Sequence, residues 1–492
     1  MAGHSEARVF LNTTFRITLN AMPTSESTLT THTGFPWRTA IALYGTSYGL
    51  CLFFLRAFFW DDWAVKTLSE QMERAYWKDV GFPPTVSFIL IDVFQRNPIY
   101  IHLATLLMFF ACGWFLFEIL KKVYFITADE RKLITIIFLV LPINSARVAM
   151  QMFSYSYSIF FFYAAWYFLV VKRGWATKLI AVVFFLLSFN TLSLITFIAV
   201  PVFHLLLLNT NKFANFKFRA FAGPILLILM APVYWIFIKT AYPPSDLRIS
   251  YYSPKFSGTI RGLLLLLIST SFLAWTIQES RTTQNLRSTK IALGAVIVSL
   301  GAFPYITSGR LVDVSEWMLN FVPRASEWES RNQLLLGLGI ALLITSSIRE
   351  SDSKFKTKAA VTLIGLCVFM NFTFMQGYML DARKQSEVIQ MLSASETVKS
   401  GNVIMINDLA VRYNARGRLV RTYEWNGMLE KAFGDKSRSS AYFAYVDCIN
   451  SEVPIPDVLV TIDASNGRFK SLLTSNIGIN MTAIKISPCP AK

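Results

Sequence analysis

Apolar runs of about twenty residues recur between residues 39 and 380, separated by short polar and basic stretches. A run of this length can cross the hydrocarbon core of a bilayer as an α-helix. When interrupted runs are counted separately, the pattern predicts about eleven membrane-spanning helices. The expected spans are 40–59, 99–120, one from 133 to a break at 142–147, 153–171, two within 175–208, 221–241, 259–278, 291–306, 334–348 and 359–380.

Polar segments flank this apolar region on both sides. Residues 1–38 are predicted to form a cytoplasmic N-terminal segment, and residues 39–380 a transmembrane domain with a long amphipathic first outer loop at 60–97. In residues 381–492 a polar helical pattern leads to short apolar runs near 402–406, 441–446, 457–462 and 477–486, which is typical of strands. The expected fold class is a polytopic α-helical membrane protein with a small C-terminal α/β domain outside the membrane.

Composition agrees with this class, since 54% of the residues are hydrophobic and only 16% are charged. The net charge of +17 is spread over short clusters between apolar runs, which indicates membrane topology and not a nucleic-acid partner. Basic residues are denser in alternate loops, at 121–132, 172–178, 209–219, 279–290 and 349–358. By the positive-inside rule these loops are cytoplasmic, so the loop at 60–97 and the C-terminal domain are expected on the outer side.

Motifs for nucleotide or metal chemistry are missing from the sequence. It has no P-loop, dinucleotide glycine fingerprint, HExxH or Cys/His metal spacing, which disfavours a nucleotide-driven pump. No cofactor and no metal site are predicted, although a divalent ion stays an open alternative. Of the five cysteines, only Cys448 and Cys489 lie in the polar tail, where a disulfide could form.

Two adjacent carboxylates, Asp61 and Asp62, end the first apolar run between Trp60 and Trp63. A carboxylate at a membrane boundary can take a proton from an acceptor hydroxyl, and indole rings can stack on sugars. Acid pairs seldom lie directly against an apolar span without a function. Both acids are candidate catalytic groups and both indoles candidate sugar contacts; the alternative is a solvated helix end.

Arginines at the same predicted face form a second group of candidates. Arg147, Arg310 and Arg331 lie near the outer ends of spans, and a planar guanidinium matches the oxygens of a lipid phosphate. The alternative for each is a side chain that extends to the lipid headgroups.

Acidic and aromatic residues alternate in the outer loop that follows residue 306. Glu316, Glu327 and Trp328 suit a hydroxyl-rich ligand, because acids accept hydrogen bonds from hydroxyls and rings cover sugar faces. An interfacial tryptophan anchor is the alternative. In the tail, 412–418 and 423–426 are polar and aromatic enough to contact a glycan or to form a solvated surface.

The many spans, the run Phe59-Trp60-Asp61-Asp62 at the start of a long outer loop, and the terminal domain resemble the GT-C class of polyprenyl-phosphate-sugar-dependent glycosyltransferases. Within this class the chain is similar to the serotype-converting O-antigen glucosyltransferases of bacteria and their phages.

The resemblance implies an inverting hexosyltransferase of the bacterial inner membrane that works on the periplasmic side. The donor would be undecaprenyl-phosphate-glucose, and the acceptor O-antigen lipopolysaccharide or another surface glycan. Asp61 or Asp62 would be the general base, and Arg147, Arg310 or Arg331 would stabilise the leaving phosphate. A lipid-sugar synthase and a flippase would have to supply the donor.

Two other classes fit a basic polytopic chain. A flippase for lipid-linked polysaccharide would carry ionisable groups in the middle of several spans, and here those positions are almost entirely apolar. An O-antigen polymerase or ligase also acts on lipid-linked glycans, but is expected to rely on large arginine-rich outer loops without an acid pair after the first span.

Overall fold

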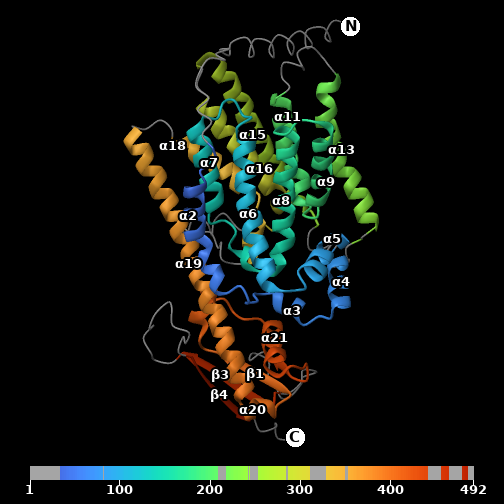
Figure 1. Cartoon of the computed structure of the whole chain (residues 1–492), viewed down its shortest axis with the longest axis vertical. Coiled ribbons are helices and arrows are strands. Elements are labelled where there is room, and N and C mark those ends of the chain that lie inside the picture. Colours follow the sequence, from blue (N-terminus) through green and yellow to red (C-terminus); the bar gives the residue numbers. More distant parts are fainter. Residues whose placement is uncertain are drawn as a thin grey trace.

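The computed structural model describes residues 34–80, 82–208, 218–241, 243, 253–283, 286–310, 328–348, 353–441, 456–464 and 479–485. These residues form a bundle of helices with a small sheet at one end, as Figure 1 shows. Five helices are long and apolar enough to cross a membrane, judged by length and composition within the described residues. They are Pro98–Leu120, Met150–Val170, Phe256–Ser280, Arg287–Thr307 and Thr357–Ala394.

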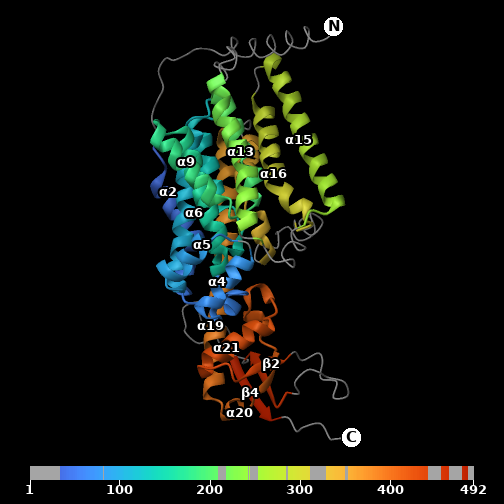
Figure 2. The same ribbon diagram turned by 90° about the vertical axis from the view of Figure 1, so that its right-hand side faces the viewer.

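Within the described residues, twelve helices of different lengths form the bundle. In chain order they are α2 (Trp37–Tyr48), α6 (Pro98–Leu120), α7 (Ala128–Val140), α8 (Phe153–Val170), α9 (Trp175–Ser188), α10 (Ser193–Phe197), α11 (Ala199–Leu208), α13 (Phe218–Ala241), α15 (Phe256–Thr283), α16 (Arg287–Thr307), α18 (Gly337–Ile348) and α19 (Ser353–Ala394). Figure 2 shows α15 standing at the edge of this bundle beside α16. Many leucines of α15 are exposed, which suits a helix that faces lipid.

Short elements gather where the bundle meets the sheet. The loop after the first apolar run contains α3 (Asp62–Lys66), α4 (Glu70–Asp79), α5 (Pro84–Ser87) and the π-helical turn η2 (Phe88–Val93). The 3₁₀ turns η3 (Ser145–Val148), η4 (Met150–Met152) and η5 (Trp328–Gln333) connect longer helices. Figures 1 and 2 place α4 and α5 at the same end of the bundle as the C-terminal sheet.

The five candidate spans coincide with five of the expected ones, those beginning near residues 99, 153, 259, 291 and 359. Other expected spans are shorter helices, including Trp175–Ser188, Ser193–Leu208 and Gly337–Ile348. The first expected span, 40–59, is broken, because α2 ends at Tyr48 and a 3₁₀ turn, η1 (Gly49–Phe53), follows. Gly49 at this break is a weak helix former. Within the described residues the structure therefore supports five candidate spans, and the count of about eleven stays a prediction.

Helix α19 joins the bundle to the C-terminal region without interruption. Its 42 residues correspond to about 63 Å of helix, roughly twice the thickness of a bilayer's hydrocarbon core. The expected last span and the polar helix expected after it are thus one continuous helix that ends at Ala394. In Figure 1 it runs along the bundle and into the C-terminal region.

The C-terminal sheet has four strands in the order β2-β1-β3-β4. The strands are β1 (Val403–Asp408), β2 (Ser439–Ala441), β3 (Val458–Ala464) and β4 (Ile479–Lys485), with β1 parallel to both neighbours and β4 antiparallel to β3. Beside the sheet lie α20 (Glu396–Lys399), α21 (Thr422–Phe433) and the turns η6 (Val411–Tyr413) and η7 (Ala415–Gly417). This confirms a small mixed sheet; most of the strand expected at 441–446 lies outside the described residues.

A buried ion pair fastens the beginnings of α7 and α16. Lys290 Nζ lies 2.8 and 2.9 Å from the two carboxylate oxygens of Glu130, and the two side chains are only 2% and 5% exposed. Glu130 also accepts a hydrogen bond from the backbone N–H of Thr127, which completes a capping box at the start of α7.

Replacing Lys290 by Met would remove the ammonium group that lies against both oxygens of the buried Glu130 carboxylate. We expect this change to destabilise the protein by about 3–5 kcal/mol, the usual cost of removing one partner of a buried ion pair. Thermal unfolding in detergent measures the effect. The control is Lys121→Met, whose partner Glu118 and own side chain are 19% and 28% exposed, and there we expect about 1 kcal/mol or less. Equal losses in the two variants would contradict the assignment.

Candidate functional site

The backbone turns sharply at residues 58–63, which we call the acid corner. Trp60 has a φ of 50°, in the left-handed region that a tryptophan adopts only when its surroundings hold it there. Its ring lies 5.7 Å from the ring of Tyr378 on α19, and the guanidinium carbon of Arg418 lies 5.4 Å from the indole centre. The corner is thus fixed by contacts with α19 and with the C-terminal region.

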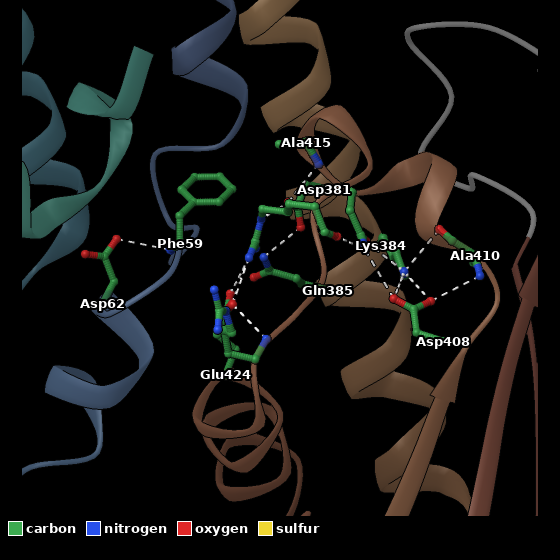
Figure 3. A network of polar contacts seen from close by, with 12 residues as sticks. Phe59, Asp62, Asp381, Lys384, Gln385, Asp408, Ala410, Ala415 and Glu424 are labelled. Carbon is green, nitrogen blue, oxygen red and sulfur yellow. Dashed lines mark hydrogen bonds and ion pairs between the residues drawn. The ribbon is translucent and has the colours of Figure 1, made fainter. Parts of the chain in front are cut away.

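Asp62 ties the acid corner to η4. Its carboxylate accepts hydrogen bonds from the backbone N–H groups of Phe59 (3.0 Å), Met150 (2.9 Å) and Gln151 (3.0 Å), and its side chain is 2% exposed. Figure 3 shows the bond to Phe59. Burial raises the pKa of Asp62 to about 7, although the three amides favour the charged form. Its oxygens therefore serve the fold and are not open to an acceptor.

Asp61 has a different environment. Its Oδ1 accepts a hydrogen bond of 2.9 Å from the hydroxyl of Tyr423, and its backbone carbonyl accepts one of 3.0 Å from the side-chain amide of Gln151. The residue is partly exposed. The structure thus separates two acids that the sequence could not rank, since Asp61 is accessible and oriented whereas Asp62 is enclosed.

The two indoles of the corner do not present open faces. Trp63 is 1% exposed and lies among apolar residues of the C-terminal region, so close to Gly427 that a Cβ there would be 2.6 Å from Trp63 Cε3. Trp60 is 9% exposed between Tyr378 and Arg418. In this conformation neither ring can stack on a sugar, which differs from what the sequence predicts, because the C-terminal region covers both.

Arg147 lies inside the bundle with 3% of its surface exposed. Its Nε donates a hydrogen bond of 2.9 Å to the carbonyl of Asn144, and its guanidinium carbon lies 3.8 Å from the centre of the Phe109 ring and 4.9 Å from that of Tyr48. Stacking on two rings offsets part of the loss of hydration. A phosphate could reach Arg147 only if these neighbours moved.

The segments that carry the three candidate arginines lie side by side. The backbone N–H of Ala146, next to Arg147, donates to the hydroxyl of Ser330, next to Arg331, at 3.0 Å. The side chain of Asn332 donates to the carbonyl of Arg310 at 2.8 Å. Met150 and Gln151 of η4, the next turn after η3, donate hydrogen bonds to Asp62. A chain of contacts therefore connects the arginine segments to the acid corner.

Several residues that the sequence predicts for the site are not among the residues that the structure describes. Glu316, Glu327, Cys448 and Cys489 are outside the described residues, and Trp328 is described only as the first residue of η5. Within the described residues, no group of three or more His, Cys, Asp or Glu side chains could hold a metal ion.

A polar network behind the acid corner was not predicted. Arg418 donates to Asp381 on α19 at 2.9 Å and to both oxygens of Glu424 on α21 at 2.8 Å. Lys384 contacts both oxygens of Asp408 at 2.5 and 2.6 Å (Figure 3). The polar and aromatic stretches 412–418 and 423–426 were the only signal for this network, and here they pack against α19 and the corner.

Comparisons of the chain with protein-family models, with curated proteins and with solved structures find no match. The fold and site by themselves define a mostly helical candidate multi-pass membrane protein with a small mixed sheet at its C-terminal end.

The raised pKa of Asp62 has a consequence for stability. Because the folded chain keeps this proton up to about pH 7 whereas an ordinary aspartate releases it near 3.8, folding takes up a proton between these values. We expect the free energy of unfolding to fall as pH rises through this window, by at most about 1.4 kcal/mol per pH unit, and this group to add no slope above it. Apparent melting temperatures of the wild type and Asp62→Asn across this range measure the difference.

The variant should lose this part of the slope and should also be less stable overall, since an amide cannot replace both carboxylate oxygens as acceptors. Asp92→Asn is the control, because that carboxyl is 42% exposed and pairs with Arg74 at the surface. Parallel slopes in the wild type and Asp62→Asn would show that Asp62 titrates like an ordinary acid.

Proposed function

We propose that the chain is an inverting membrane glycosyltransferase that moves a hexose, glucose, from an undecaprenyl-phosphate-linked donor to O-antigen or another cell-surface glycan. The observation that supports this most is the state of Asp61. This carboxylate is partly exposed, it is oriented through Oδ1 by Tyr423, and among the described residues no hydrogen bond occupies its Oδ2. A base needs such an oriented and reachable oxygen.

In the proposed reaction Asp61 Oδ2 takes the proton of the acceptor hydroxyl as the hydroxyl oxygen attacks the anomeric carbon. The bond between that carbon and the phosphate oxygen breaks, and the lipid phosphate leaves with the electron pair. Attack from the face opposite the phosphate inverts the anomeric configuration. Arg310 and Arg331 would stabilise the charge on the phosphate. Their segments are linked to the corner through η3 and η4, since Ser330 bonds Ala146, and Met150 and Gln151 bond Asp62. Arg147 would contribute if its ring neighbours moved aside.

The donor of this reaction would be held by the membrane. Its polyprenyl chain would lie in lipid beside the candidate spans, so that its phosphate reaches the level at which the acid corner ends the first apolar run. The basic loops at the other ends of the spans support a periplasmic site in a bacterial inner membrane. A periplasmic site has no nucleotide sugar, so the donor would come from a lipid-sugar synthase and a flippase.

The test is the mass of the O-antigen repeat unit from cells that express the chain and make undecaprenyl-phosphate-glucose. We expect one added hexose with the wild type and none with Asp61→Ala, because loss of a general base lowers the rate by about 10²–10⁴-fold. Asp61→Asn provides a variant of matched size, and Asp92→Asn is a control at an exposed acid. No added hexose with the wild type in a suitable acceptor strain would overturn the proposal.

A second candidate is a flippase for a lipid-linked glycan, and the position of Arg147 favours it. A guanidinium buried inside the bundle and stacked on two rings is a positive charge in the protein interior, which could bind a lipid phosphate in transit once its ring neighbours moved aside. For this activity, Arg147→Gln would stop the export of a labelled lipid-linked glycan, and the mass of the repeat unit would not change.

A further inference from the structure

We propose that Tyr423 of the C-terminal region is a positioning residue for Asp61, so that the C-terminal region completes the active site. The inference rests on the proposed function, and it names a residue far from the acid corner in sequence. The hydroxyl of Tyr423 and Oδ1 of Asp61 are 2.9 Å apart, although 362 positions separate the two residues.

The beginning of α21 is held rigidly, and this fixes where the phenol lies. Tyr423 is the second residue of the helix, and the next residue, Glu424, is fully buried. Glu424 accepts two hydrogen bonds from Arg418 and one of 3.0 Å from the backbone N–H of Arg421. Arg418 is in turn bonded to Asp381 on α19. The phenol is therefore anchored to the same long helix that packs against Trp60.

The following turns of α21 pack on the other side of the corner. Gly427 lies directly against the Trp63 ring, where any larger residue would collide. The ammonium group of Lys431 lies 5.5 Å from the Phe58 ring centre and 5.7 Å from that of Trp63. These contacts hold α21 against the corner, and they keep the backbone of Tyr423 where its hydroxyl reaches Asp61.

The charges around Tyr423 and Asp61 keep the phenol of Tyr423 protonated, so that it donates its hydrogen bond to the carboxylate. Burial and the nearby Asp61 carboxylate raise the pKa of Tyr423 above its usual value. The other charged or titratable groups around the pair are Asp62 in the corner, and Arg421, Glu424 and Arg418 on the C-terminal side. A neutral phenol that donates to a carboxylate stabilises its charged form and leaves its second oxygen to receive the proton.

The first measurement compares the wild type with Tyr423→Phe in a hexose-transfer assay. We expect kcat to fall about tenfold or more, the size of a lost hydrogen bond to a charged group, with little change in KM for the lipid donor and no change in the melting temperature. A structural role alone would lower kcat only together with the melting temperature.

The matched control is Tyr234→Phe, which removes a hydroxyl that donates to Asn190 at 3.2 Å within the bundle. It should leave kcat, KM and the melting temperature as in the wild type. If Tyr423→Phe behaves like this control, or if it lowers kcat only together with the melting temperature, the inference is wrong.

A second measurement does not depend on activity. The infrared carboxylate band of Asp61, identified as the band that Asp61→Asn lacks, is compared in the purified wild type and in Tyr423→Phe. The band should change its position in the variant, because the carboxylate loses the hydrogen bond from the phenol. An unchanged band would overturn the role of Tyr423 even if hexose transfer is found, whereas a shifted band without any transfer in the wild type would overturn only the proposed function.

Discussion

Two aromatic side chains of the acid corner, Phe58 and Trp63, are buried among apolar residues that belong to the C-terminal region. Their cluster includes Val388 on α19, Ile404 on β1 and Val460 on β3. Burial of each large apolar side chain contributes about 1.5–3 kcal/mol, so this packing is a main contribution to the stability of the contact between the bundle and the sheet. A chain cut before the sheet would expose both rings, and the acid corner would lose its support.

The same packing explains why two neighbouring acids differ. Asp62 points into the protein, where backbone amides of the corner and of η4 surround it, and Asp61 points toward α21. One carboxylate is enclosed and the other is partly exposed. Asp61 is the N-cap residue of α3 and Asp62 is its first residue, so the helical backbone turns the two consecutive side chains in different directions. The contacts of Trp60 with Tyr378 and Arg418 hold the turn that precedes this helix.

Sequence patterns were sufficient for features that depend on local order. Apolar length located the five candidate spans, and short apolar runs located β1, β3 and β4 to within a few residues. The same approach placed an acid pair where the first apolar run ends. It could not show that 40–59 is broken at Gly49, because run length does not report a local change of helix type.

Contacts between parts of the chain that are distant in sequence could not be predicted from the sequence patterns. An indole next to two acids, such as Trp63, looks like a surface residue, and only the covering by α21 makes it a core residue. Likewise nothing in the spacing links Tyr423 or Arg418 to the acid corner. The segments that carry the candidate arginines do lie in contact, but the burial of Arg147 between Phe109 and Tyr48 depends on how α2 and α6 pack.

The unbroken helix α19 connects the bundle directly to the C-terminal region. Three residues of this helix contact the elements around the site. Tyr378 packs against Trp60 of the corner, Asp381 accepts a hydrogen bond from Arg418, and Lys384 pairs with Asp408 at the end of β1. A helix in a bilayer tilts to match its apolar length to the thickness of the lipid. A tilt of α19 would therefore move Tyr378, which packs on Trp60, together with Asp381, which bonds Arg418, so the acid corner and the C-terminal sheet would respond as one unit to the thickness of the surrounding membrane.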